Sequence, residues 1–272
     1  MRKGFFLGVL FLLAVNAYSQ LGNSSIAPSV YYTNGKYSNT MSSIGVDAFS
    51  VIGIKSGDYF LGGFSTMNID SSLWKYDQTM FVVGVIGNYY PFYFKANYGF
   101  IKGTYNRKDV VYSYDDKTNI FNGTVMYNLD LFYFSFHNAF VNTVGYKNVQ
   151  SFQTGLRTDW LFLPAVSFSL DPVYSQISDG RKLFSIGGEI TLLPFSSLKI
   201  QASGFVGKRA YFFNSELLTI FNQDETQNSL IGGRVEYGIW GPITIIASYQ
   251  STKFSGYSIT YSTIGLKGFI TF

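Results

Sequence analysis

The sequence predicts an all-β protein, folded as a closed antiparallel transmembrane β-barrel of about 14 strands, within a range of roughly 12 to 16. Three observations predict this fold. Hydrophobic residues make up 47% of the 272 residues and charged residues only 13%, about half the usual share for a soluble globular protein. Apolar and small polar side chains alternate along most of the chain, which places them on opposite faces of strands. Short turns alternate with longer, more polar connections, as expected for turns and loops on opposite sides of a membrane.

The first 20 residues have the layout of a secretory signal peptide. Arg2 and Lys3 form a positive start, and the apolar stretch from Phe5 to Val15 follows. Ala17 and Ser19 then supply the small residues of a cleavage site. We expect residues 1–19 to be cleaved and residues 20–272 to form the barrel. An uncleaved membrane anchor is the alternative.

Composition excludes several kinds of site. The absence of Cys excludes disulfides, iron–sulfur clusters and thiol catalysis, and a single His excludes a His-rich metal site. We therefore expect no cofactor. Loss of Arg2 and Lys3 with the signal peptide lowers the formal net charge from +4 to +2 (4 − 2), and no Lys/Arg-rich run follows, so we expect no nucleic-acid partner. After residue 20 no apolar run reaches the roughly 18 residues of a membrane helix.

The alternation defines the strands. From Phe92 to Thr104, one face carries Phe92, Phe94 and Ala96 and the other carries Tyr93 and Lys95. Such segments lie at residues 25–33, 41–54, 58–68, 78–89, 92–105, 118–127, 130–143, 149–162, 165–175, 181–193, 197–210, 228–239, 242–252 and 257–272. Most match the roughly 9–11 residues that a strand needs to cross a bilayer at a tilt. Residues 80–89 are apolar on both faces, as in any buried strand.

The connections predict which side each loop occupies. Every second one is a tight turn, such as Tyr90–Pro91 and Trp240–Gly241, which we place on the periplasmic side. Longer connections, which we place outside the cell, span residues 34–39, 69–77, 106–116, 176–180 and 211–227. The last is the longest, and its apolar residues Leu217, Leu218, Ile220 and Phe221 predict a short helix or a segment that folds into the barrel.

A secreted soluble β-sandwich or β-solenoid is the competing interpretation, because such folds also alternate. Their polar faces meet bulk water and are normally rich in Lys and Glu. Here the polar face is mostly Ser, Thr, Asn, Gln and Gly, while the other face is crowded with Phe and Tyr. This pattern favours an apolar face in contact with lipid, and closure of the barrel leaves no strand edge unpaired.

The C-terminal residues 264–272 resemble the assembly signal of bacterial outer-membrane β-barrel proteins. That family ends its last strand with outward apolar residues at alternate positions and a terminal aromatic residue, matched here by Ile264, Leu266, Ile270 and Phe272. The chain thus resembles a porin-like outer-membrane barrel protein, and the resemblance indicates no specific subfamily. It implies export to the outer membrane, contact with membrane lipids, and insertion by the barrel-assembly machinery through the last strand.

Aromatic residues near the strand ends predict two interfacial girdles, where amphipathic rings lie at the level of the lipid headgroups. Trp160, Tyr89, Tyr90, Tyr127 and Trp240 would form the periplasmic girdle. Tyr105, Tyr174, Tyr211, Tyr249 and Tyr257 would form the outer one.

Charges of both signs fall on the polar faces, which we expect to line the lumen. The candidate pore-lining residues are Asp47, Lys95, His137, Arg157, Asp159, Asp171, Glu189, Lys199, Arg209, Arg234 and Glu236. The turn at Pro164 would place Arg157 opposite Asp171, and Glu189 would lie diagonally close to Lys199. Either these charges select solutes in a wet pore, or they pair and stiffen a narrow interior.

These observations favour a passive porin-like channel for small solutes or ions over an enzyme. A surface-exposed structural or adhesive barrel that acts through its extracellular loops is the alternative. A remote alternative is an outer-membrane lipid hydrolase, because Ser135 and His137 lie two residues apart on one strand face. That face should point into the lumen, however, and no acidic residue near them in the sequence could orient the histidine. The sequence leaves the oligomeric state open.

Overall fold

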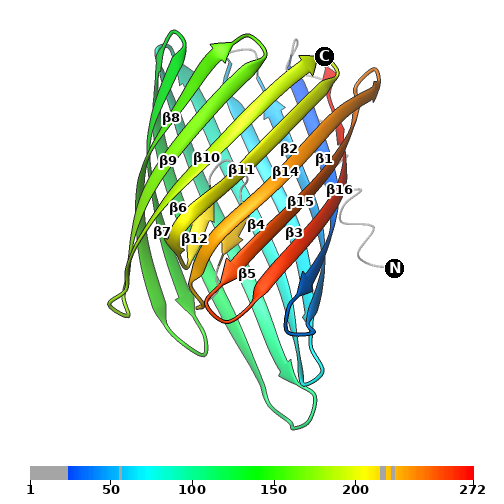
Figure 1. Cartoon of the computed structure of the whole chain (residues 1–272), viewed down its shortest axis with the longest axis vertical. Coiled ribbons are helices and arrows are strands. Elements are labelled where there is room, and N and C mark those ends of the chain that lie inside the picture. The colour runs from blue at the N-terminus through cyan, green and yellow to red at the C-terminus, as the bar shows by residue number, and fades with distance from the viewer. Residues whose placement is uncertain (1–23, 55–56, 215–218, 222–223) are drawn as a thin grey trace.

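The structure, a computed structural model, describes residues 24–54, 57–214, 219–221 and 224–272, which form a closed barrel of tilted strands (Figure 1). The long strands are β1 (Ser25–Tyr37), β2 (Ser42–Gly53), β3 (Tyr59–Asp70), β4 (Trp74–Tyr89), β5 (Phe92–Arg107), β6 (Ser113–Leu129), β7 (Phe132–Val144), β8 (Val149–Leu163), β9 (Val166–Ile177), β10 (Lys182–Phe195), β11 (Leu198–Arg209), β14 (Gln227–Trp240), β15 (Ile243–Phe254) and β16 (Ser258–Gly268). Each pairs antiparallel with its neighbours, and β16 closes the ring on β1. The predicted fold class, with 14 barrel strands, is confirmed.

The seam brings the two ends of the described chain together. The short strand β17 (Ile270–Thr271) continues β16 along β1 and pairs Thr271 with Ser25. The backbone N–H of Phe272 donates to the carbonyl of Ser24 at 2.9 Å. Both ends therefore lie with the tight turns, at what we term the turn end of the barrel, uppermost in Figure 1. The predicted signal peptide, residues 1–19, lies outside the described residues.

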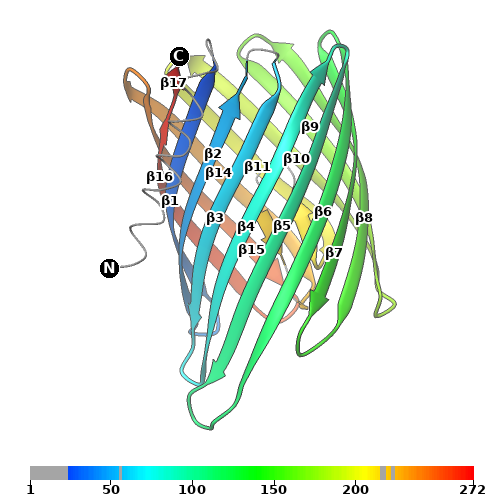
Figure 2. The ribbon, with the colours of Figure 1, turned by 180° about the vertical axis from the view of Figure 1, so that it is seen from behind.

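At the opposite end, the loop end, several strands run further than predicted. Residues 69–77 and 106–116 continue mostly as strand, so that the connections shrink to residues 71–73 and 108–112. Alternation persists here with charges on the outward face, where Lys75 and Asp77 form an ion pair at 3.1 Å. Such a face suits water rather than lipid. The β5–β6 hairpin extends furthest beyond the barrel (Figure 2).

The outward face is largely apolar, and the turn-end aromatic residues are exposed as predicted. Tyr89, Tyr90 and Trp240 are among the most exposed aromatic residues of the described chain. Three predicted members of the other girdle lie on the inner face instead. Tyr211 is buried inside the barrel, and Tyr257 stacks on Phe254 within an inner cluster of buried side chains. Tyr105 lies on the same face of β5 as the buried Ile101 and stacks on Tyr114 of β6.

The connection between β11 and β14 folds into the barrel, as its apolar composition predicted. It forms a small hairpin of β12 (Phe212–Asn214) and β13 (Thr219–Phe221), and β12 lies within the ring of strands (Figure 1). Leu217 and Leu218 lie outside the described residues. No helix in the described chain is long and apolar enough to span a membrane.

Candidate functional site in the barrel interior

The interior of the barrel has two different halves. Toward the loop end, the inward side chains of β4 to β10 form an apolar cluster that packs against the residues leading into β12. Its buried members are Met80, Ile101, Ile120, Ala139, Val141, Val149, Ile177, Leu183, Ala210, Tyr211 and Phe213. This part of the wall therefore resembles a protein core, whereas we expected polar strand faces to line the lumen.

One side chain of the wall holds β12 in place through its backbone. The side-chain Nε2 of Gln153 on β8 donates to the carbonyl of Phe213 at 3.0 Å. The N–H of Phe213 donates back to Oε1 of Gln153 at 3.2 Å. Gln153 is itself buried, so a carboxamide replaces the ladder partner that β12 lacks on this side. The phenyl ring of Phe213 is only 1% exposed.

Arg209, the last residue of β11, lies between two aromatic rings. Its guanidinium carbon is 4.0 Å from the ring centre of Phe205 on the wall and 4.2 Å from that of Phe212 on β12. Its Nε donates to the hydroxyl of Ser185 on β10 at 2.7 Å. A cation stacked between two rings and shielded from water is a strong contact. Arg209 therefore ties β12 to the barrel wall.

The backbone at Gly207 directs the chain into this arrangement. Gly207 has a φ of +107°, and an added Cβ would lie 2.5 Å from the carbonyl oxygen of Phe184. The β11–β14 register shifts between Val206 and Arg209 at the same point. Only glycine fits this bulge, which bends the strand end toward the lumen.

A histidine–carboxylate pair lies beside Arg209. Nε2 of His137 on β7 is 2.8 Å from Oδ1 of Asp171 on β9, and both side chains are largely buried. The Asp171 carboxylate also interacts electrostatically with Arg209. The structure thus supplies the acidic partner of His137 that we did not find in the sequence, where Asp171 is 34 residues away. The buried hydroxyl of Ser135 makes no hydrogen bond among the described residues, so it is not activated by His137.

Gly155 leaves the space that the His137 ring occupies. A Cβ added at Gly155 would lie 2.3 Å from Nε2 of His137, so Gly155→Val should displace the ring and break its bond to Asp171. We expect a loss of about 1–3 kcal/mol in the free energy of unfolding, measured by urea titration in lipid vesicles. Gly62→Val is the control, because an added Cβ there meets nothing within 4 Å. Equal losses in both variants would contradict the assigned role of Gly155.

Ion pairs anchor the far end of the inserted segment to the loops around it. Asp224, which precedes β14, forms ion pairs with Lys147 of the β7–β8 turn and with Arg181 of the β9–β10 turn, the latter at 2.9 Å. The hydrogen bond from Lys147, with the nearby positive charges, lowers the pKa of Asp224. The carboxylate therefore stays charged at neutral and mildly acidic pH, and this anchor weakens only as the pH falls through the lowered pKa. Burial raises the pKa of Tyr211, which remains neutral.

Toward the turn end, the interior is charged. Nη2 of Arg157 donates to Oδ1 of Asp159 on the same strand at 2.7 Å, and Nε donates to Oδ2 at 3.0 Å. Arg234 forms an ion pair with Glu236 at 2.9 Å. Most predicted lumen residues lie in this part of the wall or near mid-height, namely Asp47, Lys95, Arg157, Asp159, Glu189, Lys199, Arg234 and Glu236, while His137, Asp171 and Arg209 form the cluster beside β12.

The two predicted inter-strand charge pairs take different partners. The β8–β9 ladder sets Arg157 and Asp171 at the same level, but the close contacts of Asp171 and Arg157 described above are with His137 and Asp159. Lys199 lies 3.9 Å from Glu236 on β14 instead of beside Glu189, which accepts a hydrogen bond from Gln201. Pairing along a strand and across to β14 thus replaces the predicted pairing. No group of three or more metal-ligating residues occurs in the described chain.

A closed antiparallel barrel with strands of this length is the fold of outer-membrane porins and channels. Solved structures of outer-membrane channels are similar to it. They include the TodX deltaS2S3 mutant monoaromatic hydrocarbon channel, with a TM-score of 0.60 and 9% identity over 94% of this chain and 92% of that one. The toluene transporter TodX of P. putida gives a TM-score of 0.53 and 8% identity over 94% and 91%.

Pseudomonas aeruginosa OccK3 is also similar, with a TM-score of 0.46 and 8% identity over 93% of this chain and 98% of that one. No protein-family model and no curated protein sequence matches this chain. At these identities the similarity establishes the fold, and the function has to be argued from the interior.

Proposed function

We propose that this protein is a passive channel for small solutes in the bacterial outer membrane, narrowed at its extracellular end by β12. The observation that carries the proposal is the water-accessible charge inside a closed barrel. The inward side chains of Lys199 and Arg234 remain 37% and 27% exposed. Water therefore reaches the interior from the turn end, whereas the wall around β12 is closely packed.

The apolar wall at the loop end favours uncharged solutes over ions. An ion that passes Phe213 and its neighbours loses part of its hydration shell, while a small apolar or aromatic molecule does not. The toluene transporter TodX and its deltaS2S3 form, a monoaromatic hydrocarbon channel, share this barrel fold and support the same solute class for this chain. We therefore propose a low ionic conductance together with measurable flux of small uncharged molecules.

Planar-bilayer recording of residues 20–272 tests the proposal. We expect discrete conductance steps that are small for a barrel of this size, and swelling of loaded vesicles in small uncharged solutes. Heat-modifiable migration on gels confirms in the same sample that the barrel is folded. A folded barrel that gives neither steps nor swelling would contradict the channel.

The proposal includes the route to the membrane. Residues 1–19 would direct export, and the last strand would be recognised by the barrel-assembly machinery. Ile264, Leu266, Ile270 and Phe272 all point outward and are exposed, where a partner can reach them before lipid covers them.

A surface barrel that acts through its outer loops is the second candidate. The ion pairs of Asp224 and the protruding β5–β6 hairpin give that end a fixed shape. A silent but folded barrel that binds to cells or matrix would favour this candidate. For the hydrolase alternative, we expect no lipid hydrolysis by the wild type. Ser135→Ala and His137→Ala should give the same result as the wild type in that assay.

A further inference from the structure

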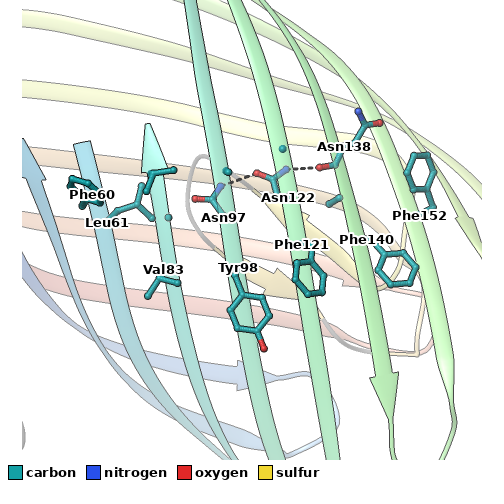
Figure 3. Close-up of a pocket in the computed structure, with 15 residues that line it drawn as sticks. Phe60, Leu61, Val83, Asn97, Tyr98, Phe121, Asn122, Asn138, Phe140 and Phe152 are labelled. Carbon is teal, nitrogen blue, oxygen red and sulfur yellow. Dashed lines mark hydrogen bonds between the residues drawn. The ribbon is translucent and has the colours of Figure 1, made fainter. Parts of the chain in front are cut away.

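A groove crosses the outward face of β3 to β8 near the middle of the barrel wall (Figure 3). It has a volume of about 710 Å³ and continues toward the turn end in a hollow of about 540 Å³. Ala96, Gly123 and Asn138 form its floor and are direct cross-strand neighbours. A Cβ added at Gly123 would meet nothing within 4 Å, so the floor is open.

Aromatic side chains form the walls of this groove. Successive outward rows along a strand are roughly 7 Å apart. The row toward the loop end contains Tyr98, Phe121, Phe140 and Phe152. The row toward the turn end includes Phe94 and Phe136. The groove is therefore one residue row wide, with small residues between two aromatic ridges.

Asn138 is the polar residue at the centre of the groove floor. It lies six residues from each end of β7, between the exposed rings of Phe136 and Phe140. Its backbone carbonyl accepts a hydrogen bond from the side chain of Asn122 at 2.8 Å, but its own carboxamide makes no hydrogen bond among the described residues (Figure 3). In the hydrocarbon of a membrane, an unpaired amide group costs several kcal/mol.

We propose that this groove is the contact surface of a homodimer, in which the carboxamide of Asn138 pairs with the partner's Asn138 across a two-fold axis along the membrane normal. A carboxamide carries both donors and an acceptor, so it complements itself under two-fold symmetry. Two copies in one membrane lie at the same depth, which brings identical residues together. An acyl chain could fill the groove but would leave the carboxamide unpaired.

The small floor residues leave room for the partner's bulky side chains on either side of the central pair. Two barrels touch along a narrow strip parallel to the two-fold axis, and small residues beside that strip allow the partner to pack closely in a membrane. Gly123 and Ala96 lie on one side of Asn138, and Thr154 lies on the other. The aromatic ridges then pack on either side of the central pair. This inference rests on the membrane location of the proposed function, and not on conduction.

Cross-linking tests the contact, because the chain has no Cys of its own. Thr154→Cys introduces a thiol beside Asn138 and leaves the carboxamide in place. With a short, membrane-permeant bis-maleimide, we expect most of the protein in native outer membranes to migrate as a dimer. Ala247→Cys, exposed on β15 and remote from β7 around the ring, is the matched control and should stay monomeric. Equal cross-linking of both variants, or of neither, would overturn the proposal.

Native mass spectrometry of the full barrel separates the possible occupants of the groove. The wild type should be dimeric, Asn138→Leu and Gly123→Leu monomeric, and Asn138→Gln dimeric because it keeps a carboxamide. Heat-modifiable migration shows that each variant is folded. A monomeric wild type that retains bound lipid would assign the groove to an acyl chain and refute the dimer. A dimer without conductance would refute the channel and leave the dimer intact.

Discussion

Replacing Phe213 by aspartate should raise the single-channel conductance, because it removes the residue that seats β12 in the barrel wall. The Phe213 ring is almost fully buried among apolar side chains such as Ile101, Ile120 and Val141. Truncating a buried Phe costs about 3–5 kcal/mol, and an unpaired buried carboxylate costs more. The two hydrogen bonds to Gln153 cannot offset this loss, since each contributes about 1 kcal/mol net.

The fourteen strands of the barrel do not depend on this contact, so the variant should still fold. Bilayer recording at constant salt measures the change, and heat-modifiable migration confirms the barrel. Phe195→Asp, at an exposed position beside a tight turn, is the control and should leave the conductance at the wild-type value. If Phe213→Asp forms a folded barrel with unchanged conductance, β12 is not the narrowest part of the path.

The barrel could be predicted because its strands repeat one simple pattern. Outward residues such as Phe121 and Leu266 alternate with small polar residues, and the alternation survives without knowledge of any partner strand. The tight turns between these segments determined the predicted number of membrane-spanning strands. The strand ends at the loop end were less predictable, since Lys75 and Asp77 read as loop residues although they lie on the outward face of β4.

The seat of β12 could not be predicted, because it depends on contacts between residues far apart in the sequence. Gln153 and Phe213 are 60 residues apart, and nothing in their local sequences marks them as partners. One signal was present in residues 80–89, which are apolar on both faces. A strand with lipid on one side needs a second apolar neighbour on the other, and Met80 finds it in the cluster around Phe213.

The sequence predicted that lumen charges of opposite sign pair, but it did not predict which residues pair. Turn geometry set Arg157 level with Asp171, yet the arginine bonds to Asp159, two residues along its own strand. On a strand, residues two apart share a face, so such a pair forms without any help from a neighbouring strand. For His137 the reverse applies, because its partner Asp171 lies two strands away, across Gly155 on β8.

Arg209 provides the second large effect. Arg209→Met keeps a long side chain between Phe205 and Phe212 but removes the charge, the stacking of a cation on two rings and the hydrogen bond to Ser185. We expect a loss of about 2–4 kcal/mol in the free energy of unfolding, measured by urea titration in lipid vesicles. Arg107→Met, which removes an exposed ion pair with Asp109, should cause little or no loss.

A second substitution separates the charge of Arg209 from its packing. Without Arg209, the buried carboxylate of Asp171 keeps its bond to His137 but loses the nearby positive charge. Arg209→Met combined with Asp171→Asn removes both charges, so the double variant should be more stable than the sum of the two single losses implies. If the stability loss of the double variant equals the sum of the two single losses, Arg209 acts only through its stacking on the rings and its hydrogen bond to Ser185. In either case, if Arg209→Met is as stable as the wild type, the guanidinium does not hold β12 against the wall, and Gln153 with the apolar cluster must do so.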